Sequence, residues 1–357
     1  MSNNINWEDL VLPHILKLQA YSSARDEFSG DAKVFLDANE NPFDEEQQNW
    51  NRYPDPLQKK IKTRLSDLKG IPAENIFLGN GSDEAIDLLF RIFCKSEESN
   101  IVTCPPTYGM YKVSSSIHNV ENIEVQLTED FQLDVKAIID KATQQSKMLF
   151  ICSPNNPTGN SLRKDDIQYL LENFNGIVVI DEAYIDFSAQ DSWIHALSEY
   201  PNLVVLQTLS KAWGLASARL GMAFANQDLI KILNKVKPPY NISGPSQKLV
   251  AESLSKKQIF DNQVKAIIAE RDDLFLKLQD IAGVKKVYPT DANFILVEIN
   301  DAKEIYQNLL KNGIVVRDRS NVSLCNDCLR ITVGTKEENE AIIRGLEGIT
   351  SGDKLNY

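Results

Sequence analysis

The segment LVVLQTLSKAWGLASARLG, residues 203–221, decides how the rest of this 357-residue chain is interpreted. Its apolar start, residues 203–206, predicts a buried strand, and Lys211 follows shortly after the strand ends. A lysine in apolar surroundings loses stabilisation of its charge, so its pKa falls and its amine can hold an aldehyde cofactor as a Schiff base. The cofactor's phosphate could then be bound by the hydroxyls of Thr208 and Ser210 and by the guanidinium of Arg219. Taken alone, a Ser-Lys pair more often marks a surface turn with a solvated lysine.

Composition and charge restrict the class of protein. The chain is long enough for two domains or one large one, and its 43% apolar and 25% charged residues are ordinary for a globular protein. The net charge of -12 argues against a nucleic-acid binder. There is no apolar run of about 18 residues and no apolar signal segment, so we expect neither a membrane span nor secretion. The five cysteines favour a cytoplasmic protein, and the scattered histidines with one Cys325-x-x-Cys328 pair predict no metal site.

From about residue 75 onward, short apolar strands alternate with helical patterns. Continuous apolar strands separated by helices predict an α/β fold, in which helices cover both faces of a mostly parallel sheet. The predicted strands are 76–79, 101–104, 148–152, 176–181 and 203–206, and the clearest helices between them are 83–93 and 165–173.

A second, smaller α/β domain is predicted near the C-terminus. A long helix over 247–281, with a possible break near 259–260, precedes strands 294–297, 314–316 and 329–333 and helices 303–311 and 337–346. The N-terminal segment carries an amphipathic pattern over 5–20 and an apolar strand over 34–36, and we expect it to fold back onto this smaller domain. The predicted division is therefore a large domain over 44–245 and a small domain formed by 1–43 and 246–357.

Four of the predicted strands end in chemically unusual residues. Because ligands of open parallel sheets bind at the carboxyl ends of the strands, we expect these four ends to form one site. They are Gly79-Asn80-Gly81-Ser82, Asn155-Asn156-Pro157, Asp181, and Ser210-Lys211. The glycine turn offers backbone N–H groups to an anion, but it is not the dinucleotide fingerprint, because Glu84 stands where the third glycine is required.

Side chains near these strand ends suit a flat pyridine cofactor. Asp181 follows an apolar strand, where a carboxylate needs a cationic partner such as a protonated ring nitrogen. Tyr184 and Asn156 could hydrogen-bond the cofactor's phenolic oxygen, and Tyr108 could stack on its ring. A helix cap at Asp181 and purely structural tyrosines are the alternatives.

As a set, these residues resemble the motifs of fold-type I aminotransferases of class II, which use pyridoxal phosphate. The resemblance covers about residues 21–346 and rests on Lys211 with Arg219, Asp181 with Tyr184, and the loop 156–159. Further supporting segments are 36–42, 53–56, 105–111, 179–187 and 328–334.

The resemblance implies a role for each matched position. Lys211 would bind the cofactor and move a proton at the reacting carbon, while Asp181 would keep the ring nitrogen protonated. Tyr184 and Asn156 would bind the phenolic oxygen, and Tyr108 would stack on the ring. The cofactor's phosphate would be held by Ser82, Asp83, Thr208, Ser210 and Arg219, with Tyr53 reaching it from the other subunit of a homodimer. The substrate pocket would be lined by Tyr21, Asn156, Arg317 and Arg330, with Arg319 competing with Arg317 for that position.

The resemblance also implies an activity. It is transamination between histidinol phosphate, a phosphorylated amino alcohol, and the dicarboxylate 2-oxoglutarate, a reaction of histidine biosynthesis. Phosphothreonine decarboxylation and aromatic amino-acid transamination on the same scaffold are alternatives. A regulator domain that senses pyridoxal phosphate is a third, but it would need an attached DNA-binding segment, for which the N-terminal region leaves no room.

Overall fold

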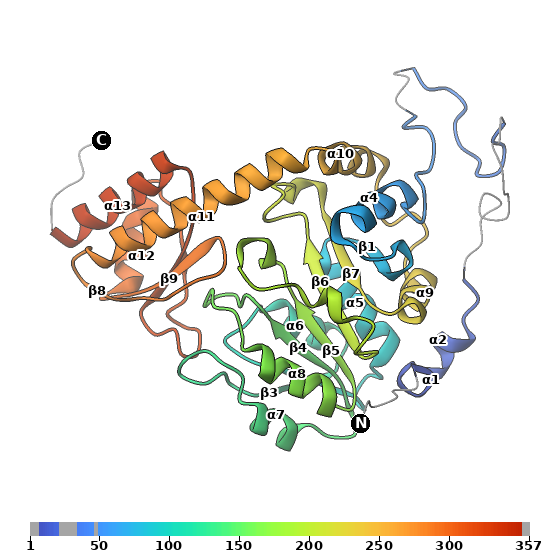
Figure 1. Ribbon diagram of the computed structural model, residues 1–357, viewed down its shortest axis with the longest axis horizontal. Coiled ribbons are helices and arrows are strands. Elements are labelled where there is room, and N and C mark those ends of the chain that lie inside the picture. The colour runs from blue at the N-terminus through green and yellow to red at the C-terminus, as the bar shows by residue number, and fades with distance from the viewer. Residues whose placement is uncertain (1–6, 21–33, 46–48, 352–357) are drawn as a thin grey trace.

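Figure 1 shows a computed structural model of the chain, which describes residues 7–20, 34–45 and 49–351. Within these residues, a seven-stranded sheet has the order β1-β7-β6-β5-β4-β2-β3. The strands are β1 (Ile76–Asn80), β2 (Asn100–Thr103), β3 (Glu121–Glu124), β4 (Ser146–Cys152), β5 (Ile177–Asp181), β6 (Leu203–Thr208) and β7 (Leu220–Phe224). Strands β3, β2, β4, β5 and β6 pair in parallel, whereas β7 is antiparallel to both β6 and β1. The predicted α/β fold with a mostly parallel sheet is confirmed.

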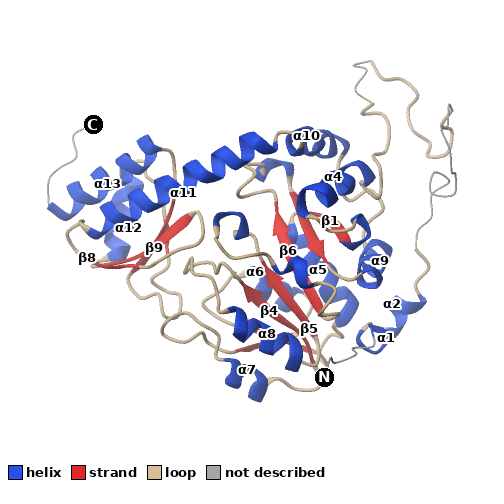
Figure 2. Cartoon of the chain, viewed as in Figure 1, coloured by secondary structure: helices blue, strands red, loops and turns tan. Residues whose placement is uncertain are grey.

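Helices cover both faces of this sheet, as Figure 2 shows. They are α4 (Lys59–Lys69), α5 (Ser82–Phe93), α6 (Met110–Ile117), α7 (Val135–Lys141), α8 (Lys164–Asn173), α9 (Gln227–Val236) and α10 (Gly244–Leu254). Successive side chains of a strand point to opposite faces. In β5, Val178 and Ile180 therefore pack with residues of α4, α8 and α10, whereas Ile177 and Val179 pack with α5 and α9. Burial on both faces explains why this strand is apolar throughout.

A smaller four-stranded sheet lies beyond the larger one. Its strands are β8 (Val284–Val287), β9 (Phe294–Ile299), β10 (Arg317–Asp318) and β11 (Cys328–Thr332), in the antiparallel order β10-β11-β9-β8. Helices α11 (Lys257–Gln279), α12 (Ala302–Lys311) and α13 (Lys336–Ser351) share a core with this sheet. Helix α11 runs from the larger body to the smaller one (Figure 1).

Two boundary predictions in the C-terminal part are wrong. The long helical pattern breaks at Ser255-Lys256 rather than near 259–260, where the N–H of Ser255 turns back to the carbonyl of Glu252. Helix α10 lies before that break, and its Val250 and Leu254 belong to the core of the larger sheet. The predicted strand 314–316 is not a strand, because the Ile314 N–H bonds the carbonyl of Leu309 at the end of α12.

The N-terminal region also differs from its prediction. Helices α1 (Trp7–Leu10) and α2 (Pro13–Lys17) contact the larger body, since Val11 and Ile15 are buried with α5 and α9 and the Leu12 N–H donates to the carbonyl of Ile92 over 2.9 Å. The apolar side chains of α2 fit the hydrophobic face left by α5, which explains this placement. Residues 34–36 form no strand, and Leu36 is 90% exposed.

Candidate active site

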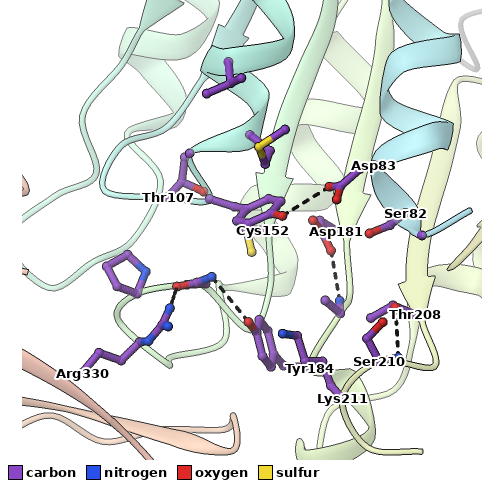
Figure 3. Close-up of a pocket in the computed structure, with 18 of the residues that line it drawn as sticks. Ser82, Asp83, Thr107, Cys152, Asp181, Tyr184, Thr208, Ser210, Lys211 and Arg330 are labelled. Atoms are coloured by element: carbon purple, nitrogen blue, oxygen red, sulfur yellow. Dashed lines mark hydrogen bonds between the residues drawn. The ribbon is translucent and has the colours of Figure 1, made fainter. Parts of the chain in front are cut away.

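A cavity of about 630 Å³ lies at the carboxyl ends of β4, β5 and β6, beside the first turn of α5 (Figure 3). All four chemically unusual strand ends contribute to it. Of the predicted site residues, those that line it are Ser82, Asp83, Tyr108, Asn156, Asp181, Tyr184, Thr208, Ser210, Lys211, Arg219, Arg317 and Arg330, and Arg319 joins them. Tyr53 lines a different cavity, and Tyr21 lies outside the described residues.

Lys211 stands in the turn just after β6, with its side chain open to this cavity. Its Nζ lies 5.7 Å from the centroid of the Tyr184 ring. Burial of the site lowers the pKa of Lys211, and the positive charge of Arg330 lowers it further, while Asp181 opposes both effects. A lowered pKa leaves more of the amine uncharged and nucleophilic near neutral pH.

Asp181 ends β5 and is only 3% exposed. Each of its carboxylate oxygens accepts one hydrogen bond: the Ala183 N–H donates to Oδ1 over 3.1 Å and the Tyr111 hydroxyl donates to Oδ2 over 2.7 Å. Burial raises the pKa of Asp181 to about 6, an effect that the Tyr111 hydrogen bond partly offsets. A carboxylate in this position stabilises a positive charge placed in the cavity.

Tyr184, Asn156 and Arg330 form a chain of polar contacts across the cavity. The Asn156 amide donates to the Tyr184 hydroxyl over 3.4 Å, and Arg330 Nη1 donates to Asn156 Oδ1 over 2.5 Å. Burial raises the pKa of Tyr184, so its hydroxyl stays a hydrogen-bond donor. Strand β11 carries Arg330, which therefore connects the smaller sheet with the loop after β4. The Nε atoms of Arg330 and Arg319 are buried and have no hydrogen-bond partner within the structure's described part.

The first turn of α5 forms an anion cradle with β7. Gly81 precedes the helix with φ 82°, and no side chain caps the N–H groups of Ser82 and Asp83. Arg219 adopts a left-handed φ of 52°, unusual for a bulky residue, and its Nη2 lies 2.8 Å from where a Cβ at Gly81 would stand. A Cβ at Gly221 would lie 2.1 Å from the Ser82 nitrogen, so glycine is required for this close approach.

The two acidic side chains of this turn are directed to other partners. The Tyr108 hydroxyl donates to Asp83 Oδ1 over 3.2 Å. Glu84 accepts the N–H of Asn80 and, over 2.9 Å, the amide of Asn241. These hydrogen bonds partly offset the repulsion that the two carboxylates would otherwise exert on an anion bound at this turn.

Two contributors were not assigned from the sequence. Tyr111 lies in the segment 105–111, but only Tyr108 was given a role there. Cys152, the last residue of β4, also lines the cavity. The available signal was that Tyr111 closes the same segment as Tyr108, and the two rings meet edge-on at 5.5 Å. The described residues contain no group of three or more His, Cys, Asp or Glu that could hold a metal ion.

Comparison with known proteins decides the family. The sequence model of the family described as "Aminotransferase class I and II" matches residues 14–346. The chain belongs to this aminotransferase family. It is 52% identical to a histidinol-phosphate aminotransferase of Parabacteroides distasonis, over 96% of this chain and 98% of that protein. It is 51% identical to a protein of the same name from Christiangramia forsetii, over 96% and 98% of the two chains.

A solved structure supports the aminotransferase fold. The crystal structure of histidinol-phosphate aminotransferase from Sinorhizobium meliloti, in complex with pyridoxal-5'-phosphate, matches with a TM-score of 0.79 and 21% identity, covering 86% of this chain and 85% of that one. This aminotransferase is therefore an enzyme with the fold-type I architecture. The comparisons do not favour the decarboxylase or regulator alternatives.

No helix in the described ranges is long and apolar enough to cross a membrane.

Proposed function

We propose that this aminotransferase uses pyridoxal 5'-phosphate to exchange an amino group between histidinol phosphate and 2-oxoglutarate. In the biosynthetic direction, glutamate donates the amino group to imidazole acetol phosphate. The observation that carries the proposal is the position of Arg317, Arg319 and Arg330 around the same cavity as Lys211. Both substrates are anionic away from the reacting carbon, and arginine provides a planar fork for a phosphate or a carboxylate.

The lining of the cavity fits pyridoxal phosphate. When bound, the cofactor supplies an electron sink for the electron pair of the substrate's reacting carbon. Lys211 would hold the cofactor through its amine and move a proton at that carbon. Asp181 would pair with the protonated ring nitrogen, because a buried carboxylate is stabilised by a cationic partner. Tyr184 and Asn156 would donate to the phenolic oxygen, and Tyr108 would cover one face of the ring.

The anion cradle fits the cofactor's phosphate. The N–H groups of Ser82 and Asp83 point out of the start of α5, where the helix dipole favours negative charge. Thr208 and Ser210 add hydroxyls from the end of β6, and Arg219 adds a guanidinium. Together they would fix the cofactor so that its reactive carbon lies at Lys211.

The substrate's far end would lie against the arginines. An unpaired buried guanidinium is costly, and an anion bound in the cavity would provide partners for Arg330 and Arg319. Arg317 is exposed and lines the same cavity, and Asp327 nearby is paired with Lys285. We keep Arg317 and Arg330 as substrate-binding residues, place Arg319 beside them, and assign Tyr21 to the same pocket.

The proposal includes a homodimer in the cytoplasm. Tyr53 is 50% exposed and stacks on Tyr240 at 4.4 Å beside a second cavity of about 750 Å³. Phe43 and Trp50 are 77% and 61% exposed on the same stretch of chain, and clustered exposed aromatic residues favour a protein interface. Tyr53 would then reach the cofactor phosphate of the partner subunit. Five free, buried thiols suit a reducing compartment. We further propose that the cofactor-binding domain begins near residue 44 and that the small domain begins after α10.

A coupled assay with three amino donors tests the proposed substrate. Histidinol phosphate should give a kcat/KM at least roughly tenfold above that of phenylalanine and of phosphothreonine, because it is the only phosphorylated amino alcohol of the three. Carbon dioxide release from phosphothreonine would support the decarboxylase instead. A preference for phenylalanine would show an aromatic aminotransferase.

A further inference from the structure

Tyr111 contacts Asp181 but does not itself line the cavity. It is the second residue of α6, and its ring is completely buried. The ring stacks on Phe150 with centroids 4.7 Å apart, and it meets Tyr108 edge-on at 5.5 Å. The hydroxyl donates to Asp181 and also lies against the thiol of Cys152.

The hydrogen bond from Tyr111 is one of two that hold the Asp181 carboxylate. Its length of 2.7 Å is typical of a hydroxyl that donates to a charged oxygen. Burial and the nearby Asp181 charge raise the pKa of Tyr111 well above its ordinary value, so the phenol keeps its proton and remains the donor. Donation to a carboxylate favours its charged form.

We propose that Tyr111 is a positioning residue whose hydroxyl keeps Asp181 charged and aimed into the cavity. Asp181 and Ala183 belong to the same turn, so the Ala183 N–H moves with the carboxylate. Tyr111, in contrast, is anchored on a separate helix and on Phe150 of β4, and it fixes the carboxylate from outside that turn. The same ring touches Tyr108, so one buried side chain supports both the partner of the ring nitrogen and the stacking residue. This assignment rests on the proposed cofactor site but not on the proposed substrate.

Tyr111→Phe removes the hydroxyl and keeps the ring that stacks on Phe150. The matched control is Tyr288→Phe, which also removes a phenol donating to a carboxylate, Glu298 at 3.2 Å, but lies outside the cavity lining. The first readout is the carboxyl ¹³C resonance of Asp181 in the cofactor-free protein, assigned by its loss in Asp181→Asn. Its titration midpoint should rise by about one pH unit in Tyr111→Phe, as expected for losing a charge-assisted hydrogen bond, and stay unchanged in the control.

The second readout is the affinity for pyridoxal phosphate at pH 5, below both midpoints, where a midpoint one unit higher leaves about tenfold less of the carboxylate charged. It should weaken about tenfold in Tyr111→Phe and remain unchanged in Tyr288→Phe. If Tyr111→Phe does not fold, 3-fluorotyrosine placed at position 111 makes the phenol a stronger donor, and the Asp181 midpoint should then fall. An Asp181 midpoint that does not respond to either change would overturn the proposal. Neither readout involves histidinol phosphate, so failure of the substrate assignment would be recognised separately.

Discussion

Replacing Asp181 by asparagine should stabilise the cofactor-free protein and weaken its binding of pyridoxal phosphate at the same time. Asparagine has the same shape and keeps an oxygen that can accept from Tyr111, but it carries no charge. Burial raises the pKa of Asp181 from 3.8 to about 6, so the folded chain holds this proton over a pH range in which the unfolded chain has lost it. The resulting stability is fully present below about pH 4 and is lost as the pH rises through about 6.

The size of the effect follows from that interval. About two pH units at about 1.4 kcal/mol each give a change of about 3 kcal/mol between pH 4 and pH 7. Urea unfolding of the two cofactor-free proteins across this range isolates Asp181, because the other titrating groups are common to both. The unfolding free energy of wild type should fall relative to Asp181→Asn by that amount.

Binding of pyridoxal phosphate, in contrast, should favour wild type over Asp181→Asn. The variant lacks the charge that pairs with the ring nitrogen, so its affinity should be at least roughly tenfold lower. Glu182→Gln is the matched control: Glu182 is equally buried one residue further on, but its carboxylate bonds Ser192, Trp193 and Gln207 outside the cavity lining. It should leave cofactor affinity unchanged. A difference in stability that does not vary with pH, or unaltered affinity in Asp181→Asn, would refute the reasoning.

Three further predictions concern the other parts of the site. Borohydride treatment of the cofactor-loaded protein should remove its visible absorbance and leave the label on Lys211 in peptide maps; a label on Lys231, Lys235 or Lys237 would contradict the assignment. Arg317→Ala and Arg330→Ala should each lower kcat/KM at least roughly tenfold for histidinol phosphate and for glutamate while the visible absorbance persists, and full efficiency in either variant would make that arginine structural. Mixed dimers of Tyr53→Phe and Lys211→Ala chains should recover activity, because one of their two sites carries neither defect; confirmed heterodimers without recovery would place Tyr53 in its own subunit's site.

The sequence predicted the strands that are buried on both faces, because burial leaves a continuous apolar run such as 177–180. It did not reveal β3 (Glu121–Glu124), which lies at the sheet edge and is polar except for Ile123. Strand β7 was also missed, because it returns antiparallel beside β6 after the loop 209–219, without the α-helix that usually separates parallel strands.

The site was predictable where it depended on strand ends, since the parallel topology alone brings Asn156, Asp181 and Lys211 to one edge. Tyr111 was not predictable in this way, because its direction depends on how α6 packs against Phe150. The sequence could not decide between Arg317 and Arg319. In the structure Arg317 pairs with Arg330 across β10 and β11, and Arg319 follows in the turn after β10, so both arginines line the cavity. The position of the N-terminal helices depended on a hydrophobic face of α5 and α9 that no local pattern indicates.

Transfer of labelled nitrogen tests the central claim most directly. [¹⁵N]glutamate and imidazole acetol phosphate are incubated with the cofactor-loaded wild-type enzyme and with Lys211→Ala, and the products are resolved by mass spectrometry. We predict [¹⁵N]histidinol phosphate and 2-oxoglutarate in equal amounts from wild type, and a loss of at least roughly a thousandfold in rate for the variant, since both covalent attachment and proton transfer depend on this amine. Wild-type enzyme that forms no labelled histidinol phosphate, or a Lys211→Ala variant that forms it at the wild-type rate, would contradict the account.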